Sequence, residues 1–232
     1  MSVPVTLTEI ECPSIPWELL CNWATTHYRD RIFTRDEMIP ARPGLLYLVQ
    51  QGAIRLMGSA QPTTGNRVIA DSEPEETFLG FVRAGLPFEF VAHAPFNFQA
   101  YAHVDNTKVI WLYWQDLERW PDIQREVLTA FRYQHQRKLL WLSTLGQRRT
   151  IDRLIGVLTL LMEECGEPWE SGYRLPFVLT HAHLGSAIGS TRVTVTRLMG
   201  RLREHGQIVI VDDNLIAMPQ LEPSTAGLAS ED

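Results

Sequence analysis

Four arginines alternate with regularly spaced apolar residues in the stretch GSTRVTVTRLMGRLREHG, residues 189–206. Val195, Leu198, Met199 and Leu202 follow the i, i+3, i+4, i+7 spacing of a helix that packs on one face. The opposite face would carry Arg192, Arg197 and other polar residues. Arginine can bond bidentately to guanine O6 and N7, and hydroxyls at a helix N-terminus suit phosphate. The stretch therefore predicts a helix that reads DNA.

The alternative is an ordinary solvated helix whose arginines pair with Glu204. Neighbouring signals favour the DNA-reading interpretation. Thr180 can cap a preceding short helix, Gly189 can make the turn, and Gly206 can end the second helix. Residues 207–219 then predict two short strands around an Asp-Asp-Asn turn. Together these features predict a helix-turn-helix with a β-hairpin wing.

Composition predicts a globular protein with two domains. The chain has 232 residues, 45% of them hydrophobic and 21% charged, with a net charge of −6. Residues 1–110 hold 8 basic and 12 acidic side chains, whereas residues 145–206 hold 8 and 6, so the acidity lies mostly outside the candidate helix. No apolar run reaches membrane length and the N-terminus lacks a secretory signal pattern, so we expect a cytoplasmic protein without membrane contact.

Three cysteines, Cys12, Cys21 and Cys165, form no CxxC pair. They fit a reducing compartment and are too few for a four-cysteine iron–sulfur site or a zinc ribbon. His181 and His183 are spaced i, i+2, so their rings would diverge on a helix. We therefore expect no metal and no cofactor.

The N-terminal half predicts a small helix followed by an antiparallel β-structure. Residues 14–30 have a helical apolar face, and residues 31–115 are short β-branched and aromatic runs broken by Gly, Pro and polar residues. TTGN at 63–66 predicts a hairpin turn. The aromatic segment 87–98 could line a pocket, although core packing is the better expectation.

Residues 116–145 predict a long helix with an apolar stripe. The stripe could pack on the β-domain, but a parallel coiled-coil dimer is favoured because an exposed seam needs a partner. The expected seam residues are Val127, Ala130, Gln134, Lys138, Trp141 and Leu145.

A helix over 151–166, ended by Gly166, begins the C-terminal part. The expected division is residues 1–115 as an effector-type β-domain, 116–146 as a dimerisation helix, 147–219 as the DNA-binding domain and 220–232 as a disordered tail.

The segment LTHAHLGSAIGSTRVTVTRLMGRLREHG (179–206) resembles the Crp/Fnr superfamily of bacterial transcription regulators, and is most similar to its nitrogen-control (NtcA) branch. LYLVQQGAIRL (46–56), FLG (78–80) and residues 116–145 extend a looser similarity. The resemblance implies an α+β fold: an N-terminal β-roll like that of cyclic-nucleotide-binding domains, a long dimerisation helix and a C-terminal winged helix-turn-helix.

The resemblance also implies a homodimer on a palindromic site in double-stranded DNA. The catabolite-activator branch has glutamate at the position of Val193, and glutamate can accept from cytosine whereas valine can only make apolar contact. A GTA…TAC-type palindrome is therefore expected instead of a TGTGA-type element. The expected DNA-binding residues are Thr180, Ser190, Thr191, Arg192, Val193, Thr194, Arg197 and Arg201.

The expected effector pocket departs from that of related sensors. The carboxylate and arginine that hold cyclic nucleotides in the family have no equivalent here, so no cAMP binding is expected, and 2-oxoglutarate is doubtful because Gln134 replaces a helix arginine. Haem on His93 or His103 is disfavoured. Either a small neutral effector or the chain's own side chains, which we favour slightly, fill the region. The pocket residues expected are Phe81, Phe98, Gln99 and Gln134.

No hydrolase, P-loop or zinc-protease motif occurs, so no catalytic residue and no enzyme activity are expected. The loop 166–174 with Trp169 is a candidate contact for RNA polymerase, although whether the protein activates or represses depends on its site in a promoter. The competing hypothesis is a ligand- or protein-docking module whose winged helix no longer binds DNA specifically.

Overall fold

The computed structural model describes residues 17–40, 42–60, 63–64, 67–68, 76–90, 96–170, 172–212 and 214–219. It divides into two compact units, Met1–Leu139 and Leu140–Asp232. The expected turn at 65–66, Cys12, His93 and the expected tail at 220–232 lie outside the described residues.

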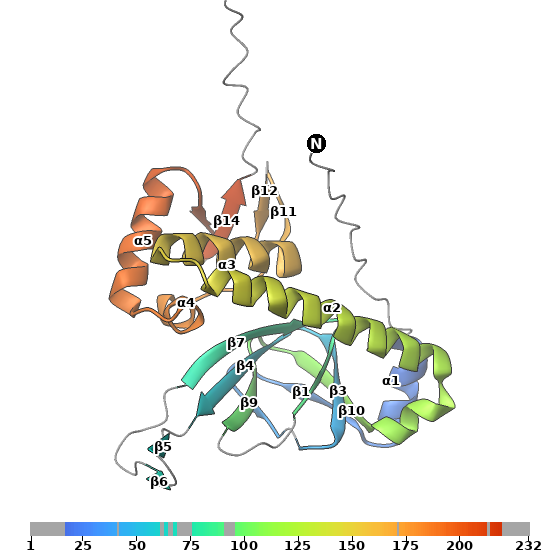
Figure 1. Ribbon diagram of the computed structural model, residues 1–232. Helices are drawn as coiled ribbons and strands as arrows, with labels where there is room; N and C mark the ends of the chain where they lie inside the picture. Colours follow the sequence, from blue (N-terminus) through green and yellow to red (C-terminus); the bar gives the residue numbers. More distant parts are fainter. Residues whose placement is uncertain are drawn as a thin grey trace, which may run out of the picture. The chain divides into compact units, whose positions relative to one another are not determined.

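Two antiparallel four-stranded sheets form the first unit (Figure 1), in the orders β1-β10-β3-β8 and β2-β9-β4-β7, beside a short β5-β6 pair. Its elements are α1 (Trp17–Thr26), β1 (Asp30–Phe33), β2 (Met38–Ile39), β3 (Leu45–Gln51), β4 (Ala53–Ala60), β5 (Thr63–Thr64), β6 (Arg67–Val68), β7 (Glu76–Arg83), β8 (Pro87–Glu89), β9 (Phe96–Ala102), β10 (Thr107–Tyr113), the 3-10 helix η1 (Trp114–Arg119) and α2 (Pro121–Leu145), which runs on into the second unit.

The strands β3 and β10 of the sheet β1-β10-β3-β8 are buried on both faces. Tyr47 and Val49 pack into the core that the two sheets share, and Leu46 and Leu48 point to the other face, where α1, η1 and α2 cover them. Side chains alternate across a strand, so a strand covered on both sides needs an unbroken apolar run. The sequence LLYLV at the start of β3 meets this need.

The long helix begins later than the sequence predicted. Residues 114–119 form η1, and α2 starts at Pro121. Proline disfavours the helical conformation in the residue before it, and Trp120 accordingly has φ −135° and ψ 75°. Asp116 anchors η1, since its carboxylate accepts from the Arg29 guanidinium at 2.6 Å and from the Tyr113 N–H at 2.8 Å.

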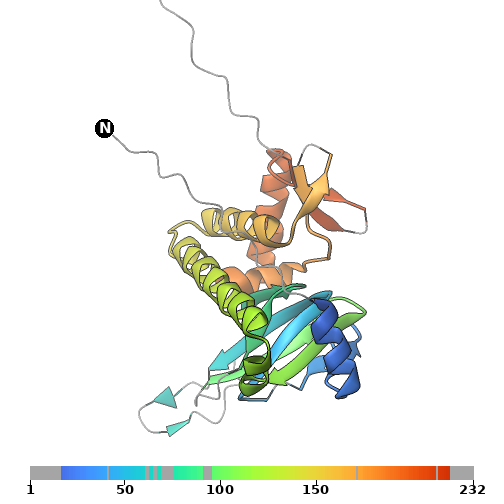
Figure 2. The same ribbon diagram turned by 90° about the vertical axis from the view of Figure 1, so that its right-hand side faces the viewer.

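The second unit is a helical core with a four-stranded sheet of order β11-β12-β14-β13. Figure 2 shows its helices and strands from a second side. The elements are α3 (Thr150–Cys165), β11 (Glu167–Trp169), β12 (Gly172–Arg174), α4 (His181–Ile188), α5 (Arg192–Glu204), β13 (Val209–Val211) and β14 (Leu215–Pro219). The hairpin expected at 207–219 is confirmed, and residues 167–179, expected as a loop with a short strand, hold the strands β11 and β12, which extend the sheet.

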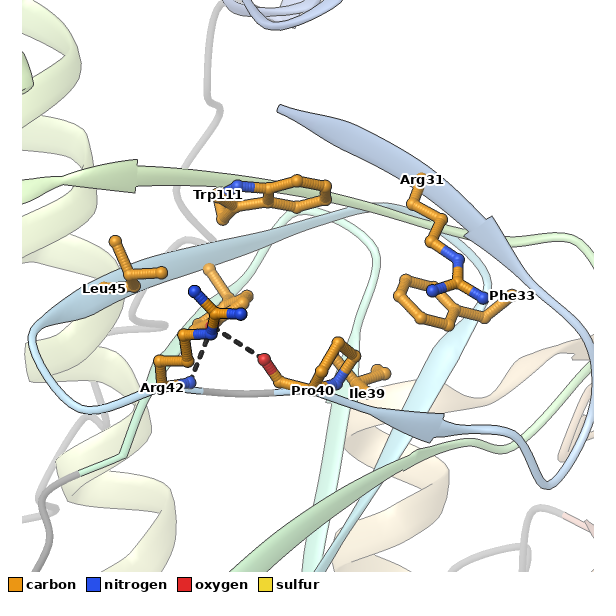
Figure 3. Close-up of a pocket in the computed structure, with 8 residues that line it drawn as sticks. Arg31, Phe33, Ile39, Pro40, Arg42, Leu45 and Trp111 are labelled. Carbon is orange, nitrogen blue, oxygen red and sulfur yellow. Dashed lines mark hydrogen bonds between the residues drawn. The ribbon is translucent and has the colours of Figure 1, made fainter. Parts of the chain in front are cut away.

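A cavity of about 260 Å³ opens in the first unit (Figure 3). It lies among β1, β2, β3, β10 and the connection between β2 and β3, and no residue of the expected effector pocket lines it. In the chain as described, no helix has the length and apolar character needed to cross a membrane.

The tight turn between β3 and β4 depends on Gly52. Its φ is +82°, and a Cβ there would lie 2.5 Å from Thr107 Oγ1 and 2.9 Å from Thr107 Cα. We expect Gly52→Ala to lower the free energy of unfolding by about 1–3 kcal/mol, because strain and collision add. Gly44→Ala is the matched control, since Gly44 has φ +80° with nothing within 4 Å of its Cβ position. Denaturant unfolding of both variants measures the difference, and equal losses would show that the approach to Thr107 is unimportant.

Candidate nucleic-acid interface

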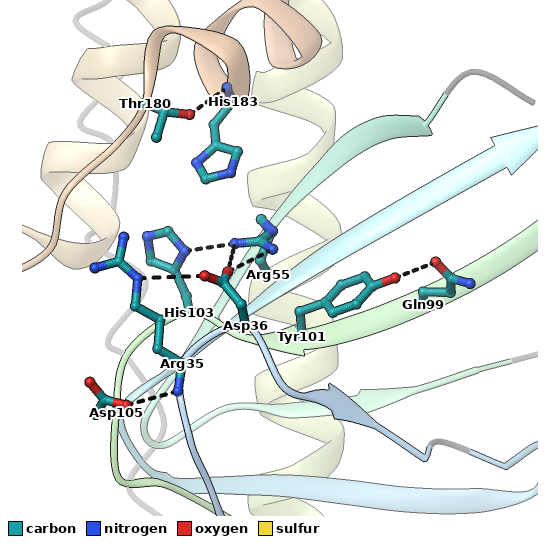
Figure 4. A network of polar contacts seen from close by, with 9 residues as sticks. All are labelled: Arg35, Asp36, Arg55, Gln99, Tyr101, His103, Asp105, Thr180 and His183. Carbon is teal, nitrogen blue, oxygen red and sulfur yellow. Dashed lines mark hydrogen bonds and ion pairs between the residues drawn. The ribbon is translucent and has the colours of Figure 1, made fainter.

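The turn between α4 and α5 is built by a threonine cap and two glycines. The Thr180 hydroxyl accepts from the His183 N–H at 3.1 Å (Figure 4) and begins α4. Gly189 ends α4 with φ 61°, in the left-handed region that glycine adopts without strain. A Cβ on Gly185 would lie 2.8 Å from the Ser190 carbonyl oxygen, so α4 and the turn approach through their backbones.

Thr191 caps α5 and shares a hydrogen bond with Thr194. The Thr191 hydroxyl accepts from the Thr194 N–H at 3.2 Å, and the two hydroxyl oxygens lie 3.0 Å apart. One hydroxyl hydrogen bridges the two oxygens, which leaves the other available to a phosphate oxygen.

The apolar stripe of α5 is its packing face, as predicted. Val195, Leu198, Met199 and Leu202 are all buried, together with Leu184, Ala187 and Ile188 of α4. Gly206 has φ 67° beyond the C-terminus of the helix, which confirms the predicted stop.

The other face of α5 is open. Val193 is 78% exposed, and Arg192, Arg197 and Arg201 are exposed beside it. No described residue forms an ion pair with these three arginines, and Glu204 pairs with none of them, in contrast to the solvated-helix alternative. Val193, Arg197 and Arg201 follow one another at intervals of four residues, which places them along one side of the helix.

His181 ties α4 to α5. Its Nδ1 lies 2.8 Å from the Thr196 hydroxyl oxygen, and that hydroxyl donates to the Arg192 carbonyl at 2.9 Å. Because the hydroxyl hydrogen is used, Nδ1 must be the donor to Thr196. Burial lowers the pKa of His181 below its ordinary value of 6.5, and the positive charge of Arg192 lowers it further.

The expected dimer seam on α2 needs correction in its N-terminal half. Val127 packs with α1 and the outer face of the first sheet, and Ala130 packs into the core between the sheets. The Gln134 amide donates to the Pro87 carbonyl at 2.9 Å, so its side chain forms a contact within the first unit. Lys138 is exposed, whereas Trp141 and Leu145 are half-buried.

A different face of α2 is exposed and apolar. Leu128, Leu139 and Leu142 are 51%, 53% and 64% exposed, and His135 lies between them on the same side. Sequence periodicity could not choose between the two stripes, because each recurs at helical spacing and only the tertiary packing separates them.

The four expected effector residues do not form one pocket. Phe98 opposes Gly58, whereas Gln99 opposes the next residue, Met57, so the two side chains leave β9 on opposite faces. Phe98 stacks on Phe90, and Gln99 accepts from the Tyr101 hydroxyl at 2.7 Å (Figure 4).

The other two expected effector residues, Phe81 and Gln134, contact different parts of the first unit. Phe81 is buried with its ring against Phe78 and His103, at centroid distances of 4.9 and 4.7 Å. Gln134 is held by Pro87 as described above. The sequence could not predict this arrangement because it depends on strand register.

Among the residues with described positions, no three His, Cys, Asp or Glu side chains gather as a metal site would require. Cys21 is half-buried and Cys165 is buried.

The C-terminal part of the chain matches known regulators. Residues 152–222 match the model of the Crp-like helix-turn-helix domain. The global nitrogen regulator of Synechocystis sp. is 38% identical over 96 residues, which are 41% of this chain and 43% of that protein. The match thus spans about two fifths of the length of this relative.

Solved structures extend the likeness to most of the chain as a likeness of fold. A cyclic nucleotide-binding domain containing protein from Listeria monocytogenes superposes with a TM-score of 0.66 at 14% identity, covering 86% of this chain and 94% of that one. FixK2 from Bradyrhizobium japonicum gives a TM-score of 0.61 at 18% identity, covering 82% and 91%. The predicted α+β fold class is confirmed: the chain has the fold of the Crp/Fnr regulators, and its residues 152–222 match the Crp-like helix-turn-helix domain.

Proposed function

We propose that this chain is a homodimeric transcription regulator that reads a palindromic DNA site through α5. The exposed side of α5 carries the support: three arginines without ion partners in the described structure, beside a valine that is 78% exposed. The exposed valine can make apolar contact with a thymine methyl, and the arginines beside it can reach base edges or phosphates. A curated relative that matches this region is a global nitrogen regulator.

The proposed site is a GTA…TAC-type palindrome. Val193 offers no acceptor to cytosine, whereas Arg192 and Arg197 can each donate two hydrogen bonds to guanine. Ser190, Thr191 and Thr194 lie around the N-terminus of α5, where backbone N–H groups and the free hydroxyl hydrogen suit phosphate. Thr180 at the start of α4 and Arg201 farther along α5 add phosphate contacts.

We propose that the dimer forms through the exposed stripe of α2 instead of the stripe first expected. Leu128, His135 and Leu142 recur every seven residues, and Leu139 lies four residues after His135. This is the period of a two-stranded coiled coil. The expected division into residues 1–115, 116–146 and 147–219 stays part of this proposal.

No cAMP is part of the proposed mechanism. The position where the family's cyclic-nucleotide branch has a carboxylate is Phe81, whose ring is buried against other aromatic side chains. An RNA polymerase contact on the hairpin of β11 and β12, where Trp169 is half-buried and Tyr173 is exposed, stays a prediction.

Substitutions on α5 should change DNA binding in a base-specific way. We expect Arg192→Ala to weaken binding to a GTA…TAC duplex by about 1–3 kcal/mol, and Val193→Glu to move the preference at the facing base toward cytosine. Fluorescence anisotropy at one stated salt concentration, with GTA…TAC and TGTGA-type duplexes, measures both effects.

The matched control is Arg203→Ala, which removes the same charge from the last turn of α5, about three turns along the helix from Arg192. It should weaken all duplexes slightly and to the same extent. Equally weak binding of the wild type and Arg192→Ala to specific and random DNA would instead support a docking module without sequence-specific binding.

Charge placed in the exposed stripe of α2 should separate the dimer. Leu139→Asp is expected to yield monomers in sedimentation velocity, because an aspartate at a seam position would be desolvated opposite its copy. Leu19→Asp on α1 is the control, since Leu19 is 48% exposed and should leave the dimer intact. Dissociation by Leu145→Asp with no effect of Leu139→Asp would instead support the first seam.

The neutral state of His181 should make the second unit sensitive to acid. The pKa of His181 is lower in the folded chain than in the unfolded chain, where it is 6.5. At pH values between these two pKa values the unfolded chain therefore binds a proton that the folded chain does not. The free energy of unfolding should therefore fall as pH drops below 6.5 and should gain nothing from this group above it. NMR titration of the imidazole tests the cause: Arg192→Ala should raise the pKa of His181, and Arg203→Ala should not. A wild-type pKa at or above 6.5 would contradict the assignment.

A further inference from the structure

The cavity in the first unit combines an apolar lining with two cations. Phe33 and Ile39 are buried at one side, and Leu45, Tyr47 and Trp111 form the other. Arg31 and Arg42 complete the lining with Pro40, and none of the eight lining residues is acidic. Figure 3 shows the two guanidinium groups reaching into the same opening from different segments.

The two arginines differ in how they are held. The Arg31 guanidinium donates to Glu37 at 2.5 Å and lies over the Phe33 ring, 4.8 Å from its centroid. The ion pair with Glu37 and the contact with the Phe33 ring hold the Arg31 guanidinium in place before any ligand binds. Arg42 has no ion pair with any residue for which the structure gives a position. One preorganised and one uncompensated cation therefore face the same small space.

The backbone that carries Arg42 is anchored to the cavity wall. The Arg42 N–H donates to the Tyr47 hydroxyl at 2.8 Å, and that hydroxyl lies 3.3 Å from the Pro40 carbonyl oxygen, to which it donates. Burial raises the pKa of Tyr47, so the hydroxyl stays neutral and keeps both hydrogen bonds. The Tyr47 ring stacks on Phe88 at a centroid distance of 4.9 Å, which holds the wall rigid.

The three lining aromatic rings come from neighbouring strands. Trp111 of β10 lies directly opposite Tyr47 of β3, and β1, which carries Phe33, pairs with the other edge of β10. Such rings offer flat apolar surface to a planar ligand. A volume of about 260 Å³ falls just below the range of roughly 300–1,000 Å³ typical of sites for drug-sized ligands, so the ligand must be small.

We propose that this cavity binds a small aromatic carboxylate. The carboxylate would accept from Arg42 and, at its other side, from the free donors of Arg31, because a guanidinium matches a carboxylate with two parallel hydrogen bonds. The ring would lie against Trp111, Phe33 and Tyr47. A neutral hydrocarbon would leave the charge of Arg42 unused, and an inorganic anion would leave the apolar walls without contact.

Isothermal titration of the full-length protein with benzoate tests the site. Benzyl alcohol lacks the charge and inorganic phosphate lacks the ring, so each removes one half of the proposed recognition. Benzoate should bind, and both comparison compounds should bind at least about tenfold more weakly.

Arg42→Gln should weaken benzoate binding by about tenfold or more, since it removes a charged donor from an exposed position without changing the core. Arg35→Gln is the matched control, because Arg35 is a neighbouring arginine that lies outside the cavity and pairs with Asp36 at 3.7 Å. It should leave binding unchanged. Trp111→Leu keeps the apolar lining but removes the ring, and should weaken benzoate several-fold.

Unchanged benzoate binding in Arg42→Gln would overturn the proposal, and so would equal losses in Arg42→Gln and Arg35→Gln. Phosphate binding as tight as benzoate would show a general anion site and refute the aromatic class. The site does not depend on the proposed DNA-binding function, and Arg42→Gln should bind the GTA…TAC duplex as the wild type does in the absence of benzoate.

Discussion

The rotation of α5 about its own axis decides which of its side chains are exposed, and the proposed DNA contacts depend on it. Val195, Leu198, Met199 and Leu202 are buried together, so the helix cannot turn without exposing part of this stripe. Each residue advances about 100° around a helix, and a shift of one position would carry Val193 away from the exposed face. The contact between Gly185 and the turn also sets the spacing of α4 and α5, because a side chain there would strike the Ser190 carbonyl.

The second organising feature is that α2 has two apolar faces. Val127 and Ala130 complete two cores of the first unit, and Gln134 adds a hydrogen bond to β8. The leucines on another side remain in water. One side of α2 can therefore pack on the β-domain while another side contacts a second copy in the proposed dimer.

The sequence predicted the helix-turn-helix well because its signals are local. A threonine cap, a left-handed glycine and a stripe of four apolar residues each act within a few positions. The late start of α2 could have been predicted from Pro121, since Trp120 before it is disfavoured as a helical residue. Features that depend on strand register could not be predicted from the sequence. Phe98 and Gln99 are neighbours in sequence but lie on opposite faces of a sheet, and Arg31 and Tyr47 line one cavity only because β1 and β3 both pair with β10.

The hydrogen bond from Gln134 to Pro87 marks how far the β-domain extends along α2. Residues after it contribute no described side chain to the two β-domain cores. A genetic junction placed beyond Gln134 would keep every described core residue of the β-domain on one side and α3, α4 and α5 on the other. Chains of this architecture can therefore exchange one C-terminal helical module for another by recombination within a single helix, without rebuilding the described cores of the β-domain.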